Sequence, residues 1–395
     1  MSTTDPSAPR VAVIGGGQLA RMMAQPAIAL GVPLRLLAEA EGVSADQVIA
    51  DSRVGDYRDL DDLRAVTEGC AVVTFDHEHV PTEHLRALAA DGVVAHPGPE
   101  ALVHAQDKIV MREAMSRLGA PQPRWAVVTD TADVEAFGLP CVLKVSRGGY
   151  DGKGVWVVRE IADAAEPLAV AERTGVRLLA EELVDFTREL SALVARAPSG
   201  QAAAYPVVAT LQVDGVCREV VAPAPDLDPA LAASAQELAL RIAGELGVTG
   251  ILAVELFEAP DPDGEGGTRV LVNELAMRPH NTGHWTQDGA VTSQFENHLR
   301  AALDLPLGSP EPRARWTVMV NILGGEDEAV GRLYDGYPHA LARDPRLRVH
   351  LYGKALRPGR KVGHVNVYGD DLDDCLERAR HAAAWFRGDL GNESE

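Results

Sequence analysis

The chain lacks any apolar run near the roughly 18 residues that a membrane-spanning helix needs, and it is poor in cationic side chains. Its 37 Lys and Arg residues stand against 58 Asp and Glu residues, which gives a formal net charge of −21 at pH 7. That balance repels a polyanion unless a strong local basic patch attracts it. We therefore expect neither a membrane nor a nucleic acid as a partner.

Cysteine is scarce as well. The four residues of this type, Cys70, Cys141, Cys217 and Cys375, are widely scattered and form no zinc-binding or redox spacing. Such thiols are typical of a reduced protein, so a cytoplasmic location is predicted. The first nine residues are polar and proline-rich without an apolar signal-peptide core, and they predict a frayed tail.

What is present is ordinary globular composition, with 46% apolar and 24% charged residues over 395 positions, enough for two or three domains. The N-terminal part alternates short apolar strands with helical stretches, which predicts a parallel sheet flanked by helices. The expected strands span residues 11–14, 34–37, 71–75 and 92–95. Three helices are expected: one that follows the first strand and ends near residue 30, one at 59–68 and one at 82–90.

The remaining chain predicts three further units after a first domain at 10–98, so that the fold class combines α/β and α+β. Two linking helices fill 99–123, the second opening at Asp107 with Lys108 just inside it. A compact module at 124–185 has four strands, and a strand-rich unit at 186–388 contains one long helix at 229–246 and a small β/α subdomain at its end. We find no internal repeat.

A glycine loop between two strands of the module is the first chemical signal. From Lys144 to Gly154 it reads Lys-Val-Ser-Arg-Gly-Gly-Tyr-Asp-Gly-Lys-Gly. Glycines let backbone N–H groups approach phosphates closely, and the two lysines neutralise their charge. The loop therefore predicts nucleotide binding, and the alternative is a glycine-rich hairpin whose lysines face water.

A pair of carboxylates is the second signal. Glu255 and Glu274 lie on apolar strands at 252–257 and 270–275, separated by a hydrophilic turn. An antiparallel hairpin would bring them together. Carboxylates are hard oxygen ligands for Mg²⁺, with Mn²⁺ as an alternative, and such an ion commonly bridges the phosphates of a nucleotide. ATP chemistry is the first hypothesis.

A glycine motif near the N-terminus offers a rival. Gly15-x-Gly17-x-x-Ala20 lies between a strand and a helix, and Glu39 lies where a ribose-binding acid of a dinucleotide fold belongs, although a solvated turn acid is an equal alternative. The motif alone suits a nicotinamide cofactor, another phosphate ligand or a tight turn. A nicotinamide oxidoreductase and a non-catalytic nucleotide-binding regulator thus stay open, but the first leaves the glycine loop and the two glutamates unexplained.

The order of these residues resembles that of ATP-grasp ligases. Within that superfamily, three segments resemble the N5-carboxyaminoimidazole ribonucleotide synthetase family: Gly15-Gly-Gly-Gln-Leu-Ala-Arg21, Gly148-Gly-Tyr-Asp-Gly-Lys-Gly154 and Arg278-Pro-His-Asn-Thr-Gly-His284. The similarity runs from about Arg10 to Phe386. It implies a Rossmann-like pre-ATP-grasp domain, a lid domain, a C-terminal ATP-grasp domain and a homodimer.

The reaction that the resemblance implies belongs to purine biosynthesis. ATP, bicarbonate and 5-aminoimidazole ribonucleotide give the N5-carboxyamino product, ADP and phosphate, and the product passes to a downstream mutase. Another ATP-grasp carboxylate–amine ligase, such as the formate-using glycinamide ribonucleotide transformylase, is the alternative with the same fold.

Site residues follow from the motifs and the resemblance together. The ATP contacts expected are Lys108, Lys144, Gly149, Tyr150, Asp151, Gly152, Lys153, Gly154, Glu181, Glu182, Leu183, Val184, Glu189, Gln212, Asn273 and Glu274. The contacts expected for the aminoimidazole nucleotide are Gly17, Gln18, Leu19, Glu78, Tyr150, Asp151, His280, Asn281, His284, Lys354, Arg360 and Lys361. Metal ligation is assigned to Glu255 and Glu274, and catalytic roles to Asp151, Arg278 and Lys354.

Some positions depart from the family pattern or carry a second interpretation. Thr74-Phe-Asp-His-Glu78 and Gln212 differ from the usual residues, which weakens Asp76 and Gln212 as contacts, whereas Glu78 keeps its place. Zinc binding by His280 and His284 is disfavoured because Pro279 and Gly283 argue against a helix. The basic cluster of Lys354, Arg357, Arg360 and Lys361 suits a ribose phosphate beside the loop at 15–18, or else a solvated loop.

Overall fold

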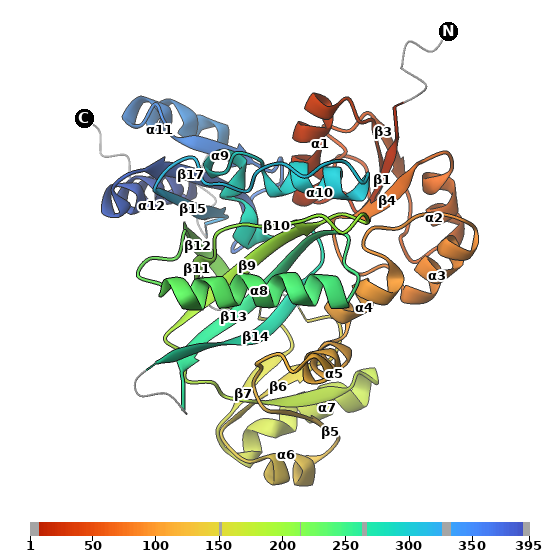
Figure 1. Cartoon of the computed structure of the whole chain (residues 1–395), viewed down its shortest axis with the longest axis vertical. Coiled ribbons are helices and arrows are strands. Elements are labelled where there is room, and N and C mark those ends of the chain that lie inside the picture. Colours follow the sequence, from red (N-terminus) through yellow and green to blue (C-terminus); the bar gives the residue numbers. More distant parts are fainter. Residues whose placement is uncertain (1–7, 150–151, 214, 263–266, 326–332, 390–395) are drawn as a thin grey trace.

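The computed structural model describes residues 8–149, 152–213, 215–262, 267–325 and 333–389. Three sheets organise these residues (Figure 1). A small parallel sheet lies at the N-terminal end, a four-stranded antiparallel sheet forms the module at the bottom of the view, and a nine-stranded sheet joins the remaining chain. The mixed class expected from the sequence is confirmed.

The N-terminal sheet has the order β3-β2-β1-β4 and is parallel throughout. Its strands are β1 (Val11–Ile14), β2 (Leu34–Ala38), β3 (Asp51–Val54) and β4 (Val72–Phe75), and its helices are α1 (Gln18–Leu30), α2 (Leu60–Thr67) and α3 (Thr82–Ala90). The βα pattern read from the sequence is therefore confirmed for β1, β2, β4 and the three helices.

One expected strand of this sheet does not form, and one strand was missed. No strand forms at 92–95 among the described residues, where only Ala95 bridges Val73. The His96 N–H still donates to the Val73 carbonyl at 2.9 Å, and Pro97, the next residue, has no N–H group with which to extend the pairing. Conversely, β3 reads Asp-Ser-Arg-Val, and this polar edge strand lacks the apolar run by which a strand is recognised.

Two linking helices, α4 (Pro99–Gln106) and α5 (Lys108–Leu118), meet at Asp107 as predicted. The Asp107 carboxylate accepts hydrogen bonds from the backbone N–H groups of Ile109 at 3.0 Å and Val110 at 3.3 Å. These N–H groups have no partner within the helix, so the aspartate fixes where α5 begins. Lys108 consequently stands in the first turn of α5.

The small module pairs its strands in the order β5-β8-β6-β7, all antiparallel. Its elements are β5 (Trp125–Val128), α6 (Thr131–Phe137), β6 (Cys141–Val145), β7 (Val155–Val158), η1 (Ile161–Ala164), α7 (Ala165–Thr174) and β8 (Leu178–Glu182). All four strands were predicted, and the glycine loop connects β6 to β7. Within that loop, Tyr150 and Asp151 lie outside the described residues.

The nine-stranded sheet runs in the order β14-β13-β9-β11-β12-β15-β17-β16, with β10 paired to β9. The long helix α8 (Pro229–Glu245) lies across β9, β13 and β14 (Figure 1). The strands are β9 (Arg188–Arg196), β10 (Ala202–Ala204), β11 (Val208–Val213), β12 (Val216–Ala222), β13 (Gly250–Pro260), β14 (Thr268–Ala276), β15 (Trp316–Leu323), β16 (Arg348–Leu351) and β17 (Lys361–Gly369).

Shorter helices complete the part of the chain beyond β14. They are η2 (Asn281–Gly283), α9 (Thr286–Gly289), α10 (Gln294–Ala302), η3 (Leu333–Gly336), α11 (Tyr337–Arg343) and the terminal α12 (Leu372–Arg387). The sequence predicted α12 and the strands around it. The expected domain limits near residues 98, 123 and 185 stay predictions.

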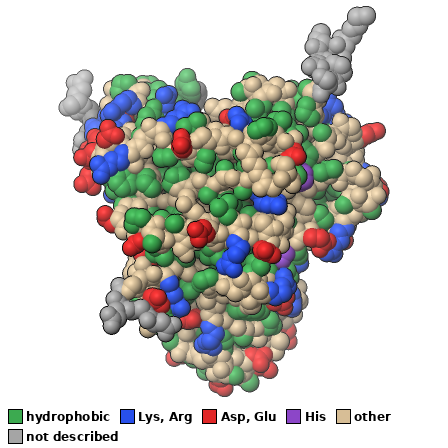
Figure 2. Space-filling view, in the orientation of Figure 1, with side chains coloured by type: hydrophobic (Ala, Val, Ile, Leu, Met, Phe, Trp, Pro, Cys, Tyr) green, Lys and Arg blue, Asp and Glu red, His purple; other side chains and the backbone are tan. Residues whose placement is uncertain are grey.

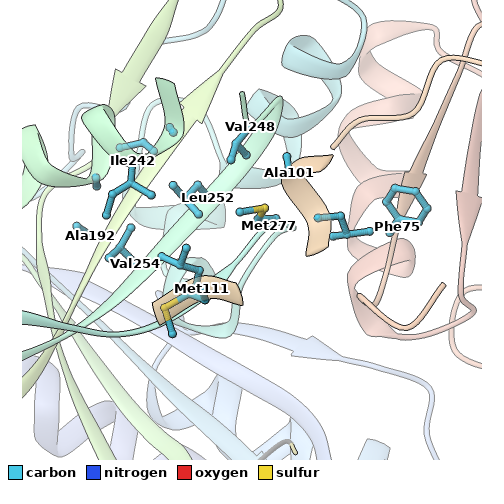
Figure 3. Packing of buried hydrophobic residues seen from close by; sticks show 14 of the residues in the cluster. Phe75, Ala101, Met111, Ala192, Ile242, Val248, Leu252, Val254 and Met277 are labelled. Carbon is cyan, nitrogen blue, oxygen red and sulfur yellow. The ribbon is translucent and has the colours of Figure 1, made fainter. Parts of the chain in front are cut away.

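One hydrophobic cluster connects the N-terminal sheet with the large sheet (Figure 3). Phe75 of β4 and Ala101 of α4 lie at one end, and Leu252 of β13 and Ile242 of α8 lie at the other. Burying a large apolar side chain contributes roughly 1.5–3 kcal/mol. The shared core therefore fixes the two sheets, and the linking helices α4 and α5 between them, relative to each other.

The surface shows no single dominant sign on the face in Figure 2, where acidic and basic side chains occur in small interspersed groups. Among the described residues, none of the helices is both long and apolar enough to traverse a lipid bilayer.

Candidate active site

Two glutamates face each other on the hairpin of β13 and β14. Glu255 and Glu274 are direct partners in the antiparallel register, immediately before a β-bulge that follows Glu255. The expected hairpin is confirmed, and so is its consequence that the two carboxylates converge. Like charges directly opposite each other destabilise a sheet, and these two side chains are only partly exposed, which is the first sign that this position serves a ligand.

Both carboxylates open into a cavity of about 830 Å³, a size suited to a nucleotide-sized ligand. Its walls come from the N-terminal domain, the linking helices, the small module and the large sheet. The predicted residues in its wall are Gln18, Leu19, Glu78, Lys108, Lys144, Gly149, Gly152, Glu181, Glu182, Leu183, Val184, Glu189, Gln212, Glu255, Asn273, Glu274, Arg278, His280, Asn281, His284 and Lys361.

The electrostatics of the two glutamates differ. Burial raises the pKa of Glu255 to about 8, assisted by the negative charges of Glu274 and Glu189. Burial alone would also raise the pKa of Glu274, but the Lys108 ammonium, which pairs with its carboxylate, outweighs that effect and lowers it. Two oxygen ligands that repel each other when ionised fit a divalent cation, because the cation removes the repulsion.

A buried ion network backs this position. The Glu181 carboxylate of β8 pairs with Arg112 Nε at 2.7 Å and with Lys144 Nζ at 2.7 Å. Arg112 also donates to the backbone carbonyls of Val272 at 2.6 Å and Asn273 at 2.9 Å on β14. Burial would raise the pKa of Glu181, but Lys144 and Arg112 lower it to about 2. The network holds the small module against β14, the strand that carries Glu274.

Arg112 was missed by the sequence reasoning. It is fully buried and lies four residues after Lys108 on α5. Positions i and i+4 share one helical face. The spacing from Lys108, which was assigned to phosphate binding, could therefore have indicated that Arg112 lies beside it.

The start of the glycine loop is tied to α5. The Lys108 N–H donates to the Ser146 carbonyl at 2.8 Å, and Arg147 Nε donates to the Asp107 carboxylate at 2.8 Å. Gly149 has no room for a side chain, because an added Cβ would meet the Lys153 carbonyl oxygen at 2.7 Å. These contacts join the start of α5, which carries Lys108, to the residues that follow Lys144 on β6, and both lysines line the cavity.

The N-terminal glycine motif uses its backbone differently from a dinucleotide site. Asp76 accepts from the Ala20 N–H at 2.8 Å, and Glu39 accepts from the Gly16 N–H at 3.0 Å. A Cβ on Gly17 would come within 2.1 Å of the Asp76 carboxylate. The amides that would hold a pyrophosphate are therefore occupied by carboxylates, which disfavours the nicotinamide alternative.

Three distant segments meet at the other end of the cavity. Lys354 donates to the Gln18 side-chain oxygen, which joins the basic cluster to the loop at 15–18. Glu78 accepts from the Met277 N–H at 2.7 Å and pairs with Arg278 Nε at 3.3 Å. His280 Nε2 lies 3.3 Å from the Glu255 carboxylate. These contacts bring residues of the N-terminal loop, the Arg278–His284 segment and the basic cluster together, and their roles as substrate contacts stay predictions.

Not every predicted residue reaches the cavity wall. Among the described ones, Gly17, Lys153, Gly154, Lys354 and Arg360 are absent from it. Lys354 nevertheless contacts Gln18, which belongs to the wall. The chain contains only five lysines in all, Lys108, Lys144, Lys153, Lys354 and Lys361, and each one occupies a position singled out for this site.

An apolar side of the cavity was also missed. Phe186 and Phe257 stack with ring centroids 4.7 Å apart, and both line the cavity. Phe257 follows Glu255 by two residues on β13, and the period-two alternation of a strand could have indicated it. A flat apolar surface next to the carboxylates suits the base of a nucleotide.

Comparison with known proteins agrees with this arrangement. An ATP-grasp domain family model matches residues 113–295, a ribonucleotide synthetase preATP-grasp domain model matches 9–106, and a phosphoribosylaminoimidazole carboxylase C-terminal domain model matches 317–378. The fold and the site define an ATP-grasp ligase, an enzyme that uses ATP.

Curated and solved relatives narrow the class. The N5-carboxyaminoimidazole ribonucleotide synthase of Mycobacterium tuberculosis is 53% identical over 383 residues, covering 96% of this chain and 88% of its own. The chain belongs to the N5-carboxyaminoimidazole ribonucleotide synthase family.

Two solved structures place the similarity in three dimensions. The Thermus thermophilus synthetase has a TM-score of 0.83 at 36% identity, covering 97% of this chain and 100% of its own. The Aspergillus clavatus synthase, solved with ADP and 5-aminoimidazole ribonucleotide, has a TM-score of 0.85 at 29% identity, covering 97% and 99%.

Proposed function

We propose that this chain carboxylates 5-aminoimidazole ribonucleotide with ATP and bicarbonate, releasing ADP and phosphate, as a step of purine biosynthesis. The activity is that of a ligase, EC 6.3.4.18. The observation that carries the proposal is that one cavity joins the Glu255–Glu274 hairpin to the Gln18 and Arg278 end. The names of the relatives support the same substrates.

Bicarbonate is a poor electrophile, so an amine attacks it only after one oxygen becomes a good leaving group. Transfer of the γ-phosphoryl group of ATP to bicarbonate gives carboxyphosphate, and the transition state spreads negative charge over the phosphoryl oxygens. Lys108 and Lys144 lie where they can neutralise that charge. Glu255 and Glu274 would hold Mg²⁺, or Mn²⁺ as an alternative, which supplies further charge neutralisation when bound.

The nucleoside part of ATP would lie towards the small module. Glu181–Val184 line the cavity, and their backbone groups would suit the adenine edge, with the Phe186 and Phe257 rings in the same wall. Glu189 would accept ribose hydroxyl groups, and Gln212 lies in the same wall. Gly149, Gly152, Lys153 and Gly154 would surround the phosphates, together with Asn273 near the metal.

The aminoimidazole nucleotide would take the opposite end. Gly17, Gln18, Leu19 and Glu78 of the N-terminal domain, with His280, Asn281, His284, Lys354, Arg360 and Lys361 of the C-terminal part, are its proposed contacts. Arg278 and Lys354 would position the reacting groups. Asp151 is proposed to orient the amine or to accept its proton, and Tyr150 to contact the substrate.

Carboxyphosphate hydrolyses readily, which gives the glycine loop a purpose. A loop that covers the cavity excludes water while the amine is held within reach. The enclosing walls from four parts of the chain support this role. We further propose a homodimer, a cytoplasmic location, delivery of the product to a mutase, and the four-part domain division at 10–98, 99–123, 124–185 and 186–388.

Phosphate release by the purified protein tests the function. Release should need ATP and Mg²⁺ and should rise with 5-aminoimidazole ribonucleotide and bicarbonate. Glycinamide ribonucleotide with formate should give no such increase, since that pair defines the alternative ligase. The opposite preference would contradict the proposal, and tight NAD(H) binding without stabilisation by ATP would favour the oxidoreductase instead.

A further inference from the structure

A buried amide lies between two histidines of the Arg278–His284 segment. Gln294, the first residue of α10, is fully buried. Its Oε1 accepts from the backbone N–H of His280 at 2.9 Å, and its Nε2 donates to the His280 carbonyl at 2.8 Å. The opposite orientation of the amide would set donor against donor and acceptor against acceptor. The backbone of His280 therefore decides which atom of Gln294 is nitrogen.

The remaining hydrogen of that nitrogen determines the state of His284. Gln294 Nε2 lies 3.0 Å from Nδ1 of His284. An amide NH₂ group only donates, so Nδ1 must accept, and a neutral imidazole then carries its proton on Nε2. Burial, reinforced by His280 and Lys361, lowers the pKa of His284 well below its ordinary value. The ring is consequently neutral.

The proton-bearing nitrogen has no partner in the described part of the protein. His284 Nε2 is buried and makes no hydrogen bond there, while His284 belongs to the cavity wall next to Asn281 and Lys361. A buried donor left without a partner costs about 1–3 kcal/mol. Such a cost is removed when a ligand in the cavity accepts the bond.

We infer that Gln294 is a positioning residue that fixes His284 as a neutral Nε2–H tautomer, so that His284 offers a hydrogen-bond donor to an oxygen of the reacting carboxyl group. The inference rests on the proposed function for the identity of that group. With Nδ1 engaged and Nε2 protonated, His284 has no free lone pair, and it does not accept the proton that the substrate amine releases.

The packing around the pair keeps the ring and the amide in place. The His284 ring lies 5.0 Å from the His364 ring and 5.6 Å from the Phe295 ring, measured between centroids. A Cβ on Gly283 would come within 2.3 Å of Gln294 Oε1. Glycine at 283 therefore allows the amide to lie against the turn that carries His284.

The tautomer can be read directly in the free protein. In ¹⁵N spectra of histidine-labelled protein, the His284 signals, assigned by their loss in His284→Asn, should show a protonated Nε2 and an unprotonated Nδ1. Gln294→Glu places a carboxylate oxygen against Nδ1, so His284 should gain a proton on Nδ1. The kcat for phosphate release with the aminoimidazole nucleotide should fall roughly 10- to 100-fold, as for other groups that fix a functional histidine, with the KM for ATP unchanged.

A matched control separates the tautomer from general loss of a buried amide. Gln236 lies on α8 and is not part of the cavity wall. Its Nε2 donates to the Tyr205 carbonyl at 2.8 Å. Gln236→Glu makes the same chemical change without touching a histidine, and it should leave kcat and the His284 signals as in the wild type. If Gln294→Glu does not fold, Gln294→Met removes the donor at similar volume and should give a mixture of tautomers.

Three results would overturn the inference: a wild-type His284 protonated on Nδ1, a folded Gln294→Glu that retains both the wild-type tautomer and kcat, or an equal loss of kcat in Gln236→Glu. The spectra need no substrate. A wild-type protein that shows the expected tautomer but no carboxylation-dependent phosphate release would instead contradict the proposed function.

Discussion

Glu255 of β13 and Glu274 of β14 lie directly opposite each other in the antiparallel register, and both line the cavity. Glu255 is the member of the pair whose ionised form is disfavoured, since burial and the opposing acid raise its pKa, whereas Lys108 stabilises the ionised Glu274. The pair is retained at a cost in stability, which is what a site that binds a divalent cation requires.

Replacing either acid should separate catalysis from folding. Glu274→Gln keeps the shape of the side chain but removes the charge that would bind metal, so kcat for phosphate release should fall roughly 100-fold or more. The unfolding temperature should fall, because Lys108 loses its counter-ion, so kcat is measured well below the unfolding transition of the variant. Glu237→Gln on the exposed side of α8 is the control and should leave kcat unchanged. A fully active Glu274→Gln would remove this residue from the metal site.

The raised pKa of Glu255 predicts a pH-dependent stability. Burial, then Glu274 and Glu189, shift it from 4.5 to about 8. The folded state therefore binds this proton more tightly than the unfolded state, and the associated stability is complete below pH 4.5 and lost as the pH rises through about 8.

Comparison with Glu255→Gln isolates that contribution, because other groups titrate in the same range. Unfolding temperatures measured without divalent metal should show the wild type losing stability relative to Glu255→Gln between pH 5 and pH 8, within the window set by these pKa values. Added Mg²⁺ should reduce the loss. A constant difference between the two proteins across this range would contradict the assignment.

Removal of Glu181 should affect stability strongly. Glu181→Gln leaves Arg112 and Lys144 buried without their counter-ion, and breaking a buried pair typically costs about 3–5 kcal/mol. Urea unfolding at pH 7 measures the change. The wild-type advantage should disappear as the pH falls from 4.5 towards about 2, because a lowered pKa stabilises only the ionised state. Glu100→Gln, at the exposed pair with Arg86, should change little.

Lys354 should act on substrate affinity rather than on ATP. Its ammonium group contacts Gln18 at the N-terminal loop. A charge-assisted bond is worth about 1.5–3 kcal/mol, so Lys354→Met should raise the KM for 5-aminoimidazole ribonucleotide about 10- to 100-fold and leave the KM for ATP unchanged. Arg343→Met on α11 is the control for loss of one positive charge. An increase confined to the KM for ATP would contradict the proposed orientation of the substrates.

Strong local patterns made much of this fold predictable. The hairpin was found because two apolar runs flank a hydrophilic turn, and the opening of α5 was found because Asp107 precedes a helical pattern. The polar β3 carries no such pattern, and the segment at 92–95 has the pattern but pairs with β4 only through a single bridge between Ala95 and Val73. Strand existence therefore depended on pairing partners that a single segment does not contain.

For the site, the residue types were predictable and their partners were not. Lys144 was expected to bind phosphate, yet its ion pair with Glu181 depends on β6 and β8 being neighbours, a relation set by tertiary packing. Gln294 shows the same limit, because its amide bonds to residues 14 and 10 positions away through a turn. Hydrogen-bond direction emerges only when both backbones are placed.

The confinement of lysine to this site has a chemical consequence. Elsewhere the basic side chains are arginines, whose guanidinium groups do not react with mild acylating agents at neutral pH. The side-chain targets of an acyl donor that modifies primary amines would thus be the five lysines at positions predicted for this site. Among side chains, acylation would therefore remove positive charge at these five lysines alone and leave every arginine charged.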